Sequence, residues 1–127
     1  MNVIDSSAWI AYFTNDTNAT KFTPPIELLS KLIVPSVTIT ETYKYILRCD
    51  GQEAALKVAT QMKQGYVVEL DIELAIEAAH FGLEYKLPLA DSIIYATAQK
   101  YGATIWTQDS HFKGLDNVEF FAKSKSK

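Results

Sequence analysis

Cysteine is nearly absent from this sequence of 127 residues, which contains only Cys49. A single cysteine excludes an intrachain disulfide and a multi-cysteine metal cluster, and it fits a reducing compartment such as the cytoplasm. We expect Cys49 to be a small packing residue. Long apolar runs are missing too, since none approaches the roughly 18 residues of a membrane span. The start, MNVIDSSAWI, has no basic stretch before an apolar one, so we expect neither membrane association nor a signal peptide.

An excess of positive charge is also missing, because 12 Lys and Arg residues face 15 Asp and Glu residues and the net charge is −3. This balance at first disfavours a nucleic-acid partner, which usually requires a basic surface. The objection weakens if four of the 15 acids surround a divalent metal, since the remaining charges nearly cancel. Only residues 122–127 are locally basic. They predict a flexible solubilising tail more readily than an RNA-contacting arm.

The apolar content, 48% of the residues, is sufficient for one core at this length. We therefore expect residues 1–127 to form a single domain. Buried strands are predicted at 1–4, 32–35, 66–70, 103–107 and 118–121. Helices are predicted at 8–13, from Pro24, at about 38–49, and at 52–63, 71–85 and 89–101, with 15–23 as a loop. This order predicts an α/β fold with a mostly parallel sheet that is covered on both faces.

The stretch from Pro88 to Phe112 places two acids at one edge of this sheet. The helix from Asp91 to Tyr101 travels ~15 Å at ~1.5 Å per residue, Gly102 ends it, and the following strand returns ~13 Å at ~3.3 Å per residue. Asp91 and Asp109 should therefore meet at the carboxyl edge of the sheet, where open α/β folds place their sites.

Two further acids are predicted at the same edge. Asp5 follows the first strand. Glu41 lies in the first turn of a helix after the second strand, where Thr38-x-x-Glu41 matches a capping box. Each of the four acids could serve only as a helix or turn cap. Together they are harder to explain in that way, because no basic residue adjoins any of them in sequence.

Clustered carboxylates repel one another by ~1 kcal/mol per pair in water and by up to ~4 kcal/mol at an effective dielectric constant near 20. Such a cluster implies a bound cation or raised pKa values. Oxygen ligands without cysteine favour the hard ions Mg²⁺ or Mn²⁺. A carboxylate-held metal with open positions suits phosphodiester hydrolysis.

The ordered motifs resemble the PIN-domain ribonucleases, and among them the VapC-type toxins of toxin–antitoxin pairs. They are Val-Ile-Asp-Ser-Ser at 3–7, Glu41 after a strand that ends in Pro-Ser, Leu-Ala-Asp-Ser-x-x-x-Ala-x-Ala from Leu89, and Thr-x-Asp-x-x-Phe from Thr107. The resemblance covers the whole chain. Each motif is weak alone, but the ordered set is specific.

The resemblance implies a three-layer α/β/α sandwich and a Mg²⁺-dependent endoribonuclease with one or two Mg²⁺ or Mn²⁺ ions per subunit. It also implies a toxin that forms a homodimer and is inhibited by a cognate antitoxin protein. The acidic metal ligands and catalytic residues would be Asp5, Glu41, Asp91 and Asp109. Asp5 and Asp91 would bind metal directly, and the other two partly through water.

Several neighbouring residues are weaker candidates. Ser6 and Thr107 match small hydroxyl positions of the family, where they would orient a carboxylate or water. Lys44 and Arg48 share a helix face with Glu41 and could hold an RNA phosphate.

Three other side chains have more ordinary explanations. Tyr45 could stack an RNA base, although packing or a dimer contact explains it more simply. His111 could assist proton transfer, but a histidine in a surface turn is the simpler interpretation. His80 is predicted to be a helix-packing residue.

Two alternatives stay open. A phosphoacceptor receiver module also binds Mg²⁺ at the carboxyl edge of a parallel sheet, but Asp71 and Lys123 fit its required acceptor and lysine poorly. A non-catalytic RNA- or protein-binding domain could keep the fold without the chemistry. For the antitoxin, we expect a docking surface of exposed apolar residues, namely Trp9, Tyr12, Phe13 and Leu28.

Overall fold

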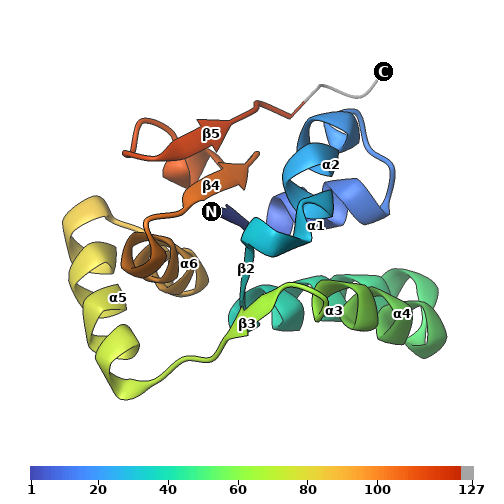
Figure 1. Ribbon diagram of the computed structural model, residues 1–127, viewed down its shortest axis with the longest axis horizontal. Coiled ribbons are helices and arrows are strands. Elements are labelled where there is room, and N and C mark those ends of the chain that lie inside the picture. The colour runs from blue at the N-terminus through green and yellow to red at the C-terminus, as the bar shows by residue number, and fades with distance from the viewer. Residues whose placement is uncertain (124–127) are drawn as a thin grey trace.

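Five short parallel strands form one sheet in the order β3-β2-β1-β4-β5 (Figure 1). The computed structural model describes residues 1–123 of the chain. The strands are β1 (Asn2–Ile4), β2 (Leu32–Pro35), β3 (Tyr66–Val68), β4 (Thr104–Thr107) and β5 (Val118–Phe120). All four neighbouring pairs are parallel, and Val3 lies opposite both Ile33 and Ile105. The predicted strands and their parallel arrangement are confirmed.

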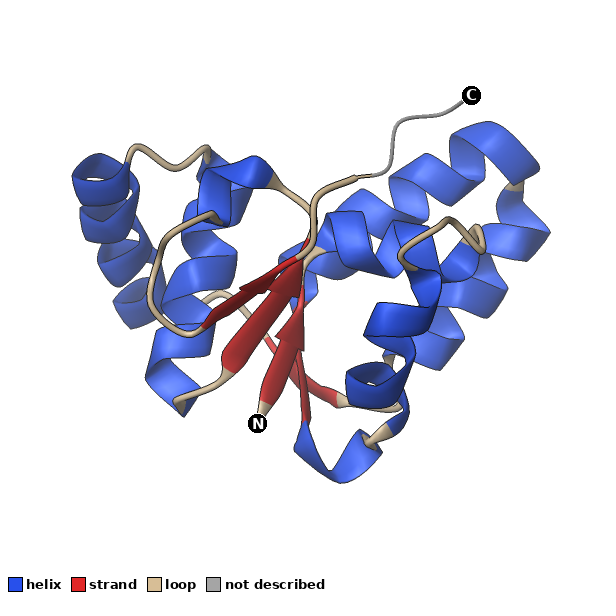
Figure 2. Ribbon diagram, turned by 90° about the horizontal axis from the view of Figure 1, so that it is seen from above, coloured by secondary structure: helices blue, strands red, loops and turns tan. Residues whose placement is uncertain are grey.

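Helices cover both faces of this sheet, which confirms the three-layer α/β/α sandwich (Figure 2). They are α1 (Ser6–Phe13), α2 (Ala19–Glu27), α3 (Ser36–Asp50), α4 (Gln52–Met62), α5 (Ile72–Tyr85) and α6 (Leu89–Tyr101), with the short 3-10 helices η1 (Leu29–Lys31) and η2 (Ser110–Phe112). Within residues 1–123, no helix combines the length and apolar character that crossing a bilayer requires.

The alternation of side chains along the strands divides the core into two clusters, one on each face. Val3, Ile33 and Ile105 pack with α5 and α6 on one face. Ile4 and Val34 point to the other face and pack with α1 to α4. Helix α6 is buried over most of its length, since it lies between the sheet and α5 (Figures 1 and 2). Gly102 ends it at φ 60, in the left-handed region that glycine tolerates.

The loop predicted for residues 15–23 is confirmed only for residues 15–18. Helix α2 already begins at Ala19, and Pro24 lies inside it rather than at its start. Phe22 and Ile26 are buried in the core. Their packing outweighs the cost of the prolines, so tertiary contacts override local preference here.

The capping box proposed for Thr38 and Glu41 is also wrong. Helix α3 begins at Ser36, and the Thr38 hydroxyl donates a hydrogen bond to the carbonyl of Pro35 at 2.7 Å. Glu41 is therefore the sixth residue of the helix, in its second turn. Cys49 near the helix end is exposed, so it is not a packing residue.

One surface prediction fails in part as well. Trp9 is buried, at 1% exposure, so it cannot belong to the proposed antitoxin-docking surface, whereas Leu28 is exposed. On α5, the stripe that contains Ile72, Ile76 and Leu83 faces solvent, at 80%, 57% and 86% exposure. The helix instead turns Leu74 and Ala78 to the core. Of the predicted tail 122–127, residues 124–127 lie outside the described residues.

Candidate active site

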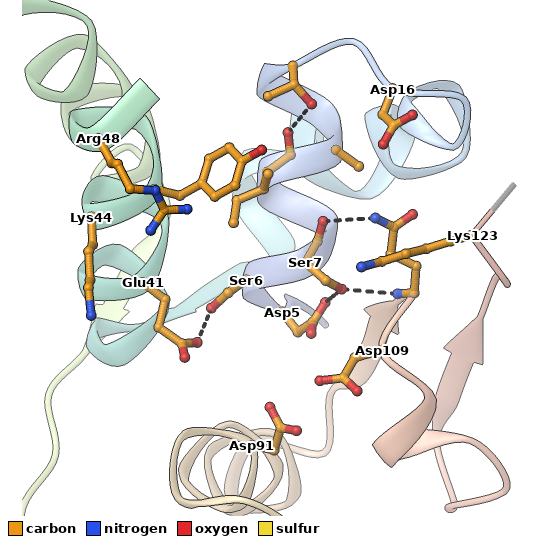
Figure 3. A pocket seen from close by; sticks show the side chains of 15 residues that line it. Asp5, Ser6, Ser7, Asp16, Glu41, Lys44, Arg48, Asp91, Asp109 and Lys123 are labelled. Carbon is orange, nitrogen blue, oxygen red and sulfur yellow. Dashed lines mark hydrogen bonds between the residues drawn. The ribbon is translucent and has the colours of Figure 1, made fainter. Parts of the chain in front are cut away.

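The four predicted acids line one pocket of about 520 Å³ at the carboxyl edge of the sheet (Figure 3). Asp5 directly follows β1, and Asp109 follows the neighbouring β4. Asp91 lies in the first turn of α6, and Glu41 comes from α3. The chain leaves β1 toward β2 on one side and returns to β4 on the other. The pocket therefore lies at the point where strand order reverses, the usual ligand position in open α/β sheets.

Asp5 has a structural role and also faces the pocket. Its Oδ1 caps helix α1 by accepting a hydrogen bond from the Ala8 backbone N–H at 3.1 Å. The same oxygen accepts a second hydrogen bond from the Ser7 hydroxyl at 2.8 Å. The side chain is thus fixed in direction although it is only 2% exposed. The capping interpretation of Asp5 is correct, and it leaves room for a second role.

His111 lies between Asp91 and Asp109. Its Nδ1 is 3.2 Å from Oδ2 of Asp91 and 2.8 Å from Oδ1 of Asp109. Because η2 turns the chain back, Asp109 Oδ1 also accepts the backbone N–H of His111 at 2.9 Å. His111 is exposed in the surface turn η2, as the simpler interpretation expects, and it also contacts two of the acids. One ligand atom from each of the three side chains lies within 4.8 Å of the others, a spacing that can hold a metal ion.

Two hydroxyl groups lie beside the acids. The Ser6 hydroxyl donates a hydrogen bond to Oε1 of Glu41 at 2.6 Å and so links α1 to α3. The Thr107 hydroxyl accepts the backbone N–H of Asp109 at 2.8 Å, which fixes the turn after β4. Both side chains are buried. The structure thus places Ser6 and Thr107 beside the acids, each in contact with a different one.

Burial makes two of the carboxyl groups poor acids. The pKa of Asp5 is raised to about 7, chiefly by desolvation, although hydrogen bonds from Ser7, Ala8 and Thr107 oppose the shift. The pKa of Asp91 is raised to about 8 by desolvation first, then by a hydrogen bond and charge repulsion from Asp109 and by the charges of Asp5 and Glu41. Burial and mutual repulsion therefore disfavour the ionised form of both carboxyl groups in the metal-free protein.

This arrangement fits a divalent cation. Four carboxylates from four segments face one pocket, and two of them are destabilised as anions. A bound cation would stabilise the ionised form of each carboxylate. Oxygen donors suit Mg²⁺ or Mn²⁺, and the His111 nitrogen beside them is a ligand that Mn²⁺ accepts more readily than Mg²⁺.

Basic side chains line the same pocket. Lys44 and Arg48 face it from α3, and Lys123 faces it from the C-terminal segment (Figure 3). The Arg48 guanidinium lies over the ring of Tyr45, 5.3 Å from its centroid. Tyr45 is half-buried and also lines the pocket. His80 is exposed on α5, so its predicted packing role is wrong.

Residues 3–118 match the model of the PIN domain family. This chain belongs to the PIN-domain family. The match covers all four acids, the whole of β2, β3 and β4, and part of β1 and β5. The receiver-module alternative is therefore set aside, because the family that matches is a different one. No curated protein sequence matches this PIN domain.

Solved structures share the fold of this PIN domain. A toxin–antitoxin complex from Klebsiella pneumoniae superposes with a TM-score of 0.77 at 20% identity, covering 94% of this chain and 96% of that chain. VapC20 of Mycobacterium tuberculosis, a sarcin-ricin loop cleaving toxin, superposes with a TM-score of 0.77 at 20% identity. The superposition covers 94% of this chain and 98% of VapC20. DNA-bound VapBC from Salmonella typhimurium superposes with a TM-score of 0.73 at 17% identity, over 95% of this chain and 96% of that chain. At sequence identities of 17–20%, these superpositions show that the proteins share the fold of this chain.

Sequence reasoning missed several polar residues in or beside the PIN-domain pocket. Ser7 and Gln108 line it, and buried Asn18 donates a hydrogen bond to Gln108 at 2.9 Å. Asn18 is 90 residues from Gln108 in sequence, so no local pattern indicates this pairing. Ser7 directly follows the Asp5-Ser6 pair, and its position in the first turn after a capping acid was an available signal.

Proposed function

We propose that this PIN domain is a divalent-metal-dependent endoribonuclease and the toxin of a toxin–antitoxin pair. The observation that supports this most strongly is the convergence of Asp5, Glu41, Asp91 and Asp109 on one pocket at the switch point of the sheet. Two of these carboxyl groups are buried with raised pKa values, which is costly for folding and typical of a functional site.

The carboxylates have distinct tasks in this proposal. Asp5 and Asp91 would hold the cation, and Glu41 and Asp109 would act partly through water. A divalent cation in such a site polarises the phosphate and lowers the pKa of water. Ser6 holds the Glu41 carboxylate toward the pocket by its 2.6 Å hydrogen bond. Ser7 and the Ala8 N–H fix the direction of Asp5.

The reaction is the hydrolysis of an RNA phosphodiester. A water molecule attacks phosphorus in line, and its proton passes to Asp91 or Asp109. The bond from phosphorus to the 3′ oxygen breaks and this oxygen takes up a proton from solvent, so the products carry a 5′-phosphate and a 3′-hydroxyl. Lys44 and Arg48, which line the pocket beside Glu41, bind a phosphate of the RNA.

The toxin assignment draws on the structural relatives. VapC20 is a sarcin-ricin loop cleaving toxin, and other relatives are toxin–antitoxin or VapBC complexes. An antitoxin for this chain would inhibit it most directly by placing a basic side chain among the four acids. Leu28 and Leu29 are exposed on the α1–α2 side of the molecule and remain available to such a partner.

A homodimer is the second assembly that we propose. The exposed stripe of Ile72, Ile76 and Leu83 on α5 follows helical spacing and forms an apolar face. Leu70 and Leu89 are exposed near its two ends. Apolar patches of this kind commonly mark protein interfaces. We assign this face to a second copy of the chain.

Cleavage of a mixed pool of structured RNAs tests the proposed function. Wild-type protein should produce discrete fragments with Mg²⁺ or Mn²⁺ and none with EDTA. Asp5→Asn should be inactive yet folded, because asparagine also caps helices. Asp116→Asn removes an exposed carboxylate outside the pocket and should keep full activity. A folded, metal-binding wild-type protein that cleaves no RNA would instead favour the non-catalytic binding module.

A further inference from the structure

Asn18 holds the segment that follows β5 beside the acidic pocket through a hydrogen bond. This side chain is 5% exposed, and its Nδ2 donates hydrogen bonds to the carbonyl of Ala122 at 3.0 Å and to Oε1 of Gln108 at 2.9 Å. The Phe121 backbone N–H is bonded to the carbonyl of Thr107 at 2.9 Å. The Phe121 ring stacks on Trp106 at a centroid distance of 6.2 Å. These contacts together hold the chain in place up to Ala122.

The same hydrogen bonds connect this segment to the site. The Gln108 backbone N–H donates to the Ser7 hydroxyl at 3.2 Å, and its side-chain amide donates to the Ser7 carbonyl at 3.4 Å. Ser7 in turn donates to Oδ1 of Asp5 at 2.8 Å. One continuous network thus joins Ala122, Asn18, Gln108 and Ser7 to a carboxylate of the pocket.

Lys123 directly follows Ala122, the residue that is hydrogen-bonded to Asn18. Its side chain lines the acidic pocket and extends toward Ser7 (Figure 3). Lys44 and Arg48 line the opposite wall, on α3. Among residues 1–123, none of these three cations forms an ion pair with a carboxylate. They surround the acids without neutralising them, which leaves the cations available to another anion.

The pocket also continues past Lys123. A second depression of about 490 Å³ shares Ser7, Gln108, Asp109 and Lys123 with the first. It extends over Phe120 and Ala122 along the C-terminal segment. A strand that passes between Lys44 and Lys123 would therefore cross the four acids and leave through this second depression.

We propose that Lys123 binds a phosphate of the RNA on the side of the scissile bond opposite to Lys44 and Arg48, and that Asn18 is the residue that positions it. This inference rests on the proposed ribonuclease function and specifies the path of its substrate. Each phosphate neutralised by a cation releases counterions, so the contact has a salt-dependent signature. This contact would give Lys123 a role beyond the solubilising one predicted for residues 122–127.

RNA binding in the Asp91→Asn background, which should not cleave, tests the contact. The probe is a single-stranded mixed-sequence RNA 12-mer, and its Kd is measured against KCl concentration. Lys123→Gln should weaken binding about three- to tenfold and reduce the slope of log K against log salt by about 0.7. Lys57→Gln, an exposed lysine of α4 outside both depressions, is the matched control and should change neither.

Asn18→Ala distinguishes positioning from stability. It keeps every charge, so a purely structural role would lower the melting temperature and leave the salt slope unchanged. Positioning of Lys123 predicts a smaller slope in a protein that is still folded. A slope equal to that of the parent would show that Asn18 does not position the lysine.

A scan with single neutral methylphosphonate linkages locates the contacts. The parent should lose affinity at one linkage where Lys123→Gln loses none, and Lys44→Gln should identify a different linkage across the cleavage site.

If Lys123→Gln binds RNA with the same affinity and salt slope as Lys57→Gln while the wild type cleaves RNA, this inference fails and the proposed function stands. Lys123-dependent binding without cleavage by the wild type would overturn the proposed function and support the contact. Absence of RNA binding by the parent overturns the inference.

Discussion

The hydroxyl of Ser6 donates a 2.6 Å hydrogen bond to Oε1 of Glu41, a residue 35 positions away on a different helix. Glu41 is only partly buried, so this bond is what directs its carboxylate into the pocket. Ser6→Ala should therefore reduce RNA cleavage by about 10- to 100-fold, the usual effect of losing a partner that orients a ligand. The loss of stability should be only about 1 kcal/mol.

Single-turnover cleavage rates and urea unfolding measure these two effects. Ser6→Thr keeps the hydroxyl and should restore most of the rate. Ser30→Ala, at an exposed position away from the pocket, is the control. A wild-type rate in Ser6→Ala would show that the orientation of Glu41 does not matter.

The stability of the metal-free protein should fall as pH rises. Asp5 has a folded-state pKa of about 7, whereas an unperturbed aspartate has a pKa of 3.8. Below pH 4 the folded and unfolded states both hold this proton, so Asp5 does not change the free energy of unfolding there. Between pH 4 and 7 the unfolded state releases it more easily, and the free energy of unfolding decreases by on the order of 4 kcal/mol. Asp91, with a pKa of about 8, extends the decrease to higher pH.

Urea unfolding in EDTA at pH 4.5 to 8.5 measures this decrease. Asp5→Asn removes the titrating group and keeps a helix cap, so its stability should vary less with pH and exceed that of the wild type at pH 8. Asp116→Asn should retain the wild-type profile, because this exposed acid lies outside the pocket. A wild-type profile in Asp5→Asn would contradict the assignment of the raised pKa to Asp5.

A divalent cation should stabilise the folded state, and more strongly at high pH. Binding to the folded state alone stabilises by RT ln(1 + [L]/Kd), about 2.7 kcal/mol at a concentration of 100 Kd. Protons compete for Asp5 and Asp91, so the rise in melting temperature with 10 mM Mg²⁺ should be larger at pH 8 than at pH 5. Asp91→Asn should abolish most of this rise. An equal rise in Asp91→Asn and the wild type would place the metal elsewhere.

The apolar stripe on α5 should form the interface of a homodimer. Ile76→Glu places a charge in its centre and should convert a dimer into a monomer, because burying an unpaired charge in an interface is costly. Sedimentation equilibrium measures the mass of each species. Leu56→Glu is the matched control, since Leu56 is 50% exposed on α4 and lies outside the stripe. A monomeric wild type, or a dimeric Ile76→Glu, would exclude this face.

The sheet and its acidic edge could be predicted because they depend on local signals. Short apolar runs indicated the strands, and Gly102 marked the end of α6. The lengths of helix and strand then placed Asp91 and Asp109 at one edge, and the structure brings both to the same pocket. These features depend on the rise per residue and on the parallel arrangement of strands, both of which are general.

Features that depend on packing could not be predicted in this way. The apolar stripe of α5 has the spacing of a core face, yet the helix turns Leu74 and Ala78 inward instead. Periodicity shows that a face is apolar, but not which partner covers it. Burial of Phe22 extends α2 across two prolines, against local preference. Trp9 is buried by the same α1–α2 packing.

Contacts within the site that join distant segments were also beyond the sequence. His111 meets Asp91 only because η2 turns it back across the pocket. Asn18 reaches Ala122 over 104 residues. Such pairs leave no trace in spacing or composition.

Cleavage of RNA by the four single variants Asp5→Asn, Glu41→Gln, Asp91→Asn and Asp109→Asn, beside Asp116→Asn, tests the central claim most directly. Each reaction is run with Mg²⁺ at equal concentrations of protein shown to be folded by circular dichroism. The account predicts that all four pocket variants lose at least about 100-fold in rate and that Asp116→Asn cleaves as the wild type does. Wild-type cleavage by folded Asp5→Asn and Asp91→Asn would show that these carboxylates do not form the active site.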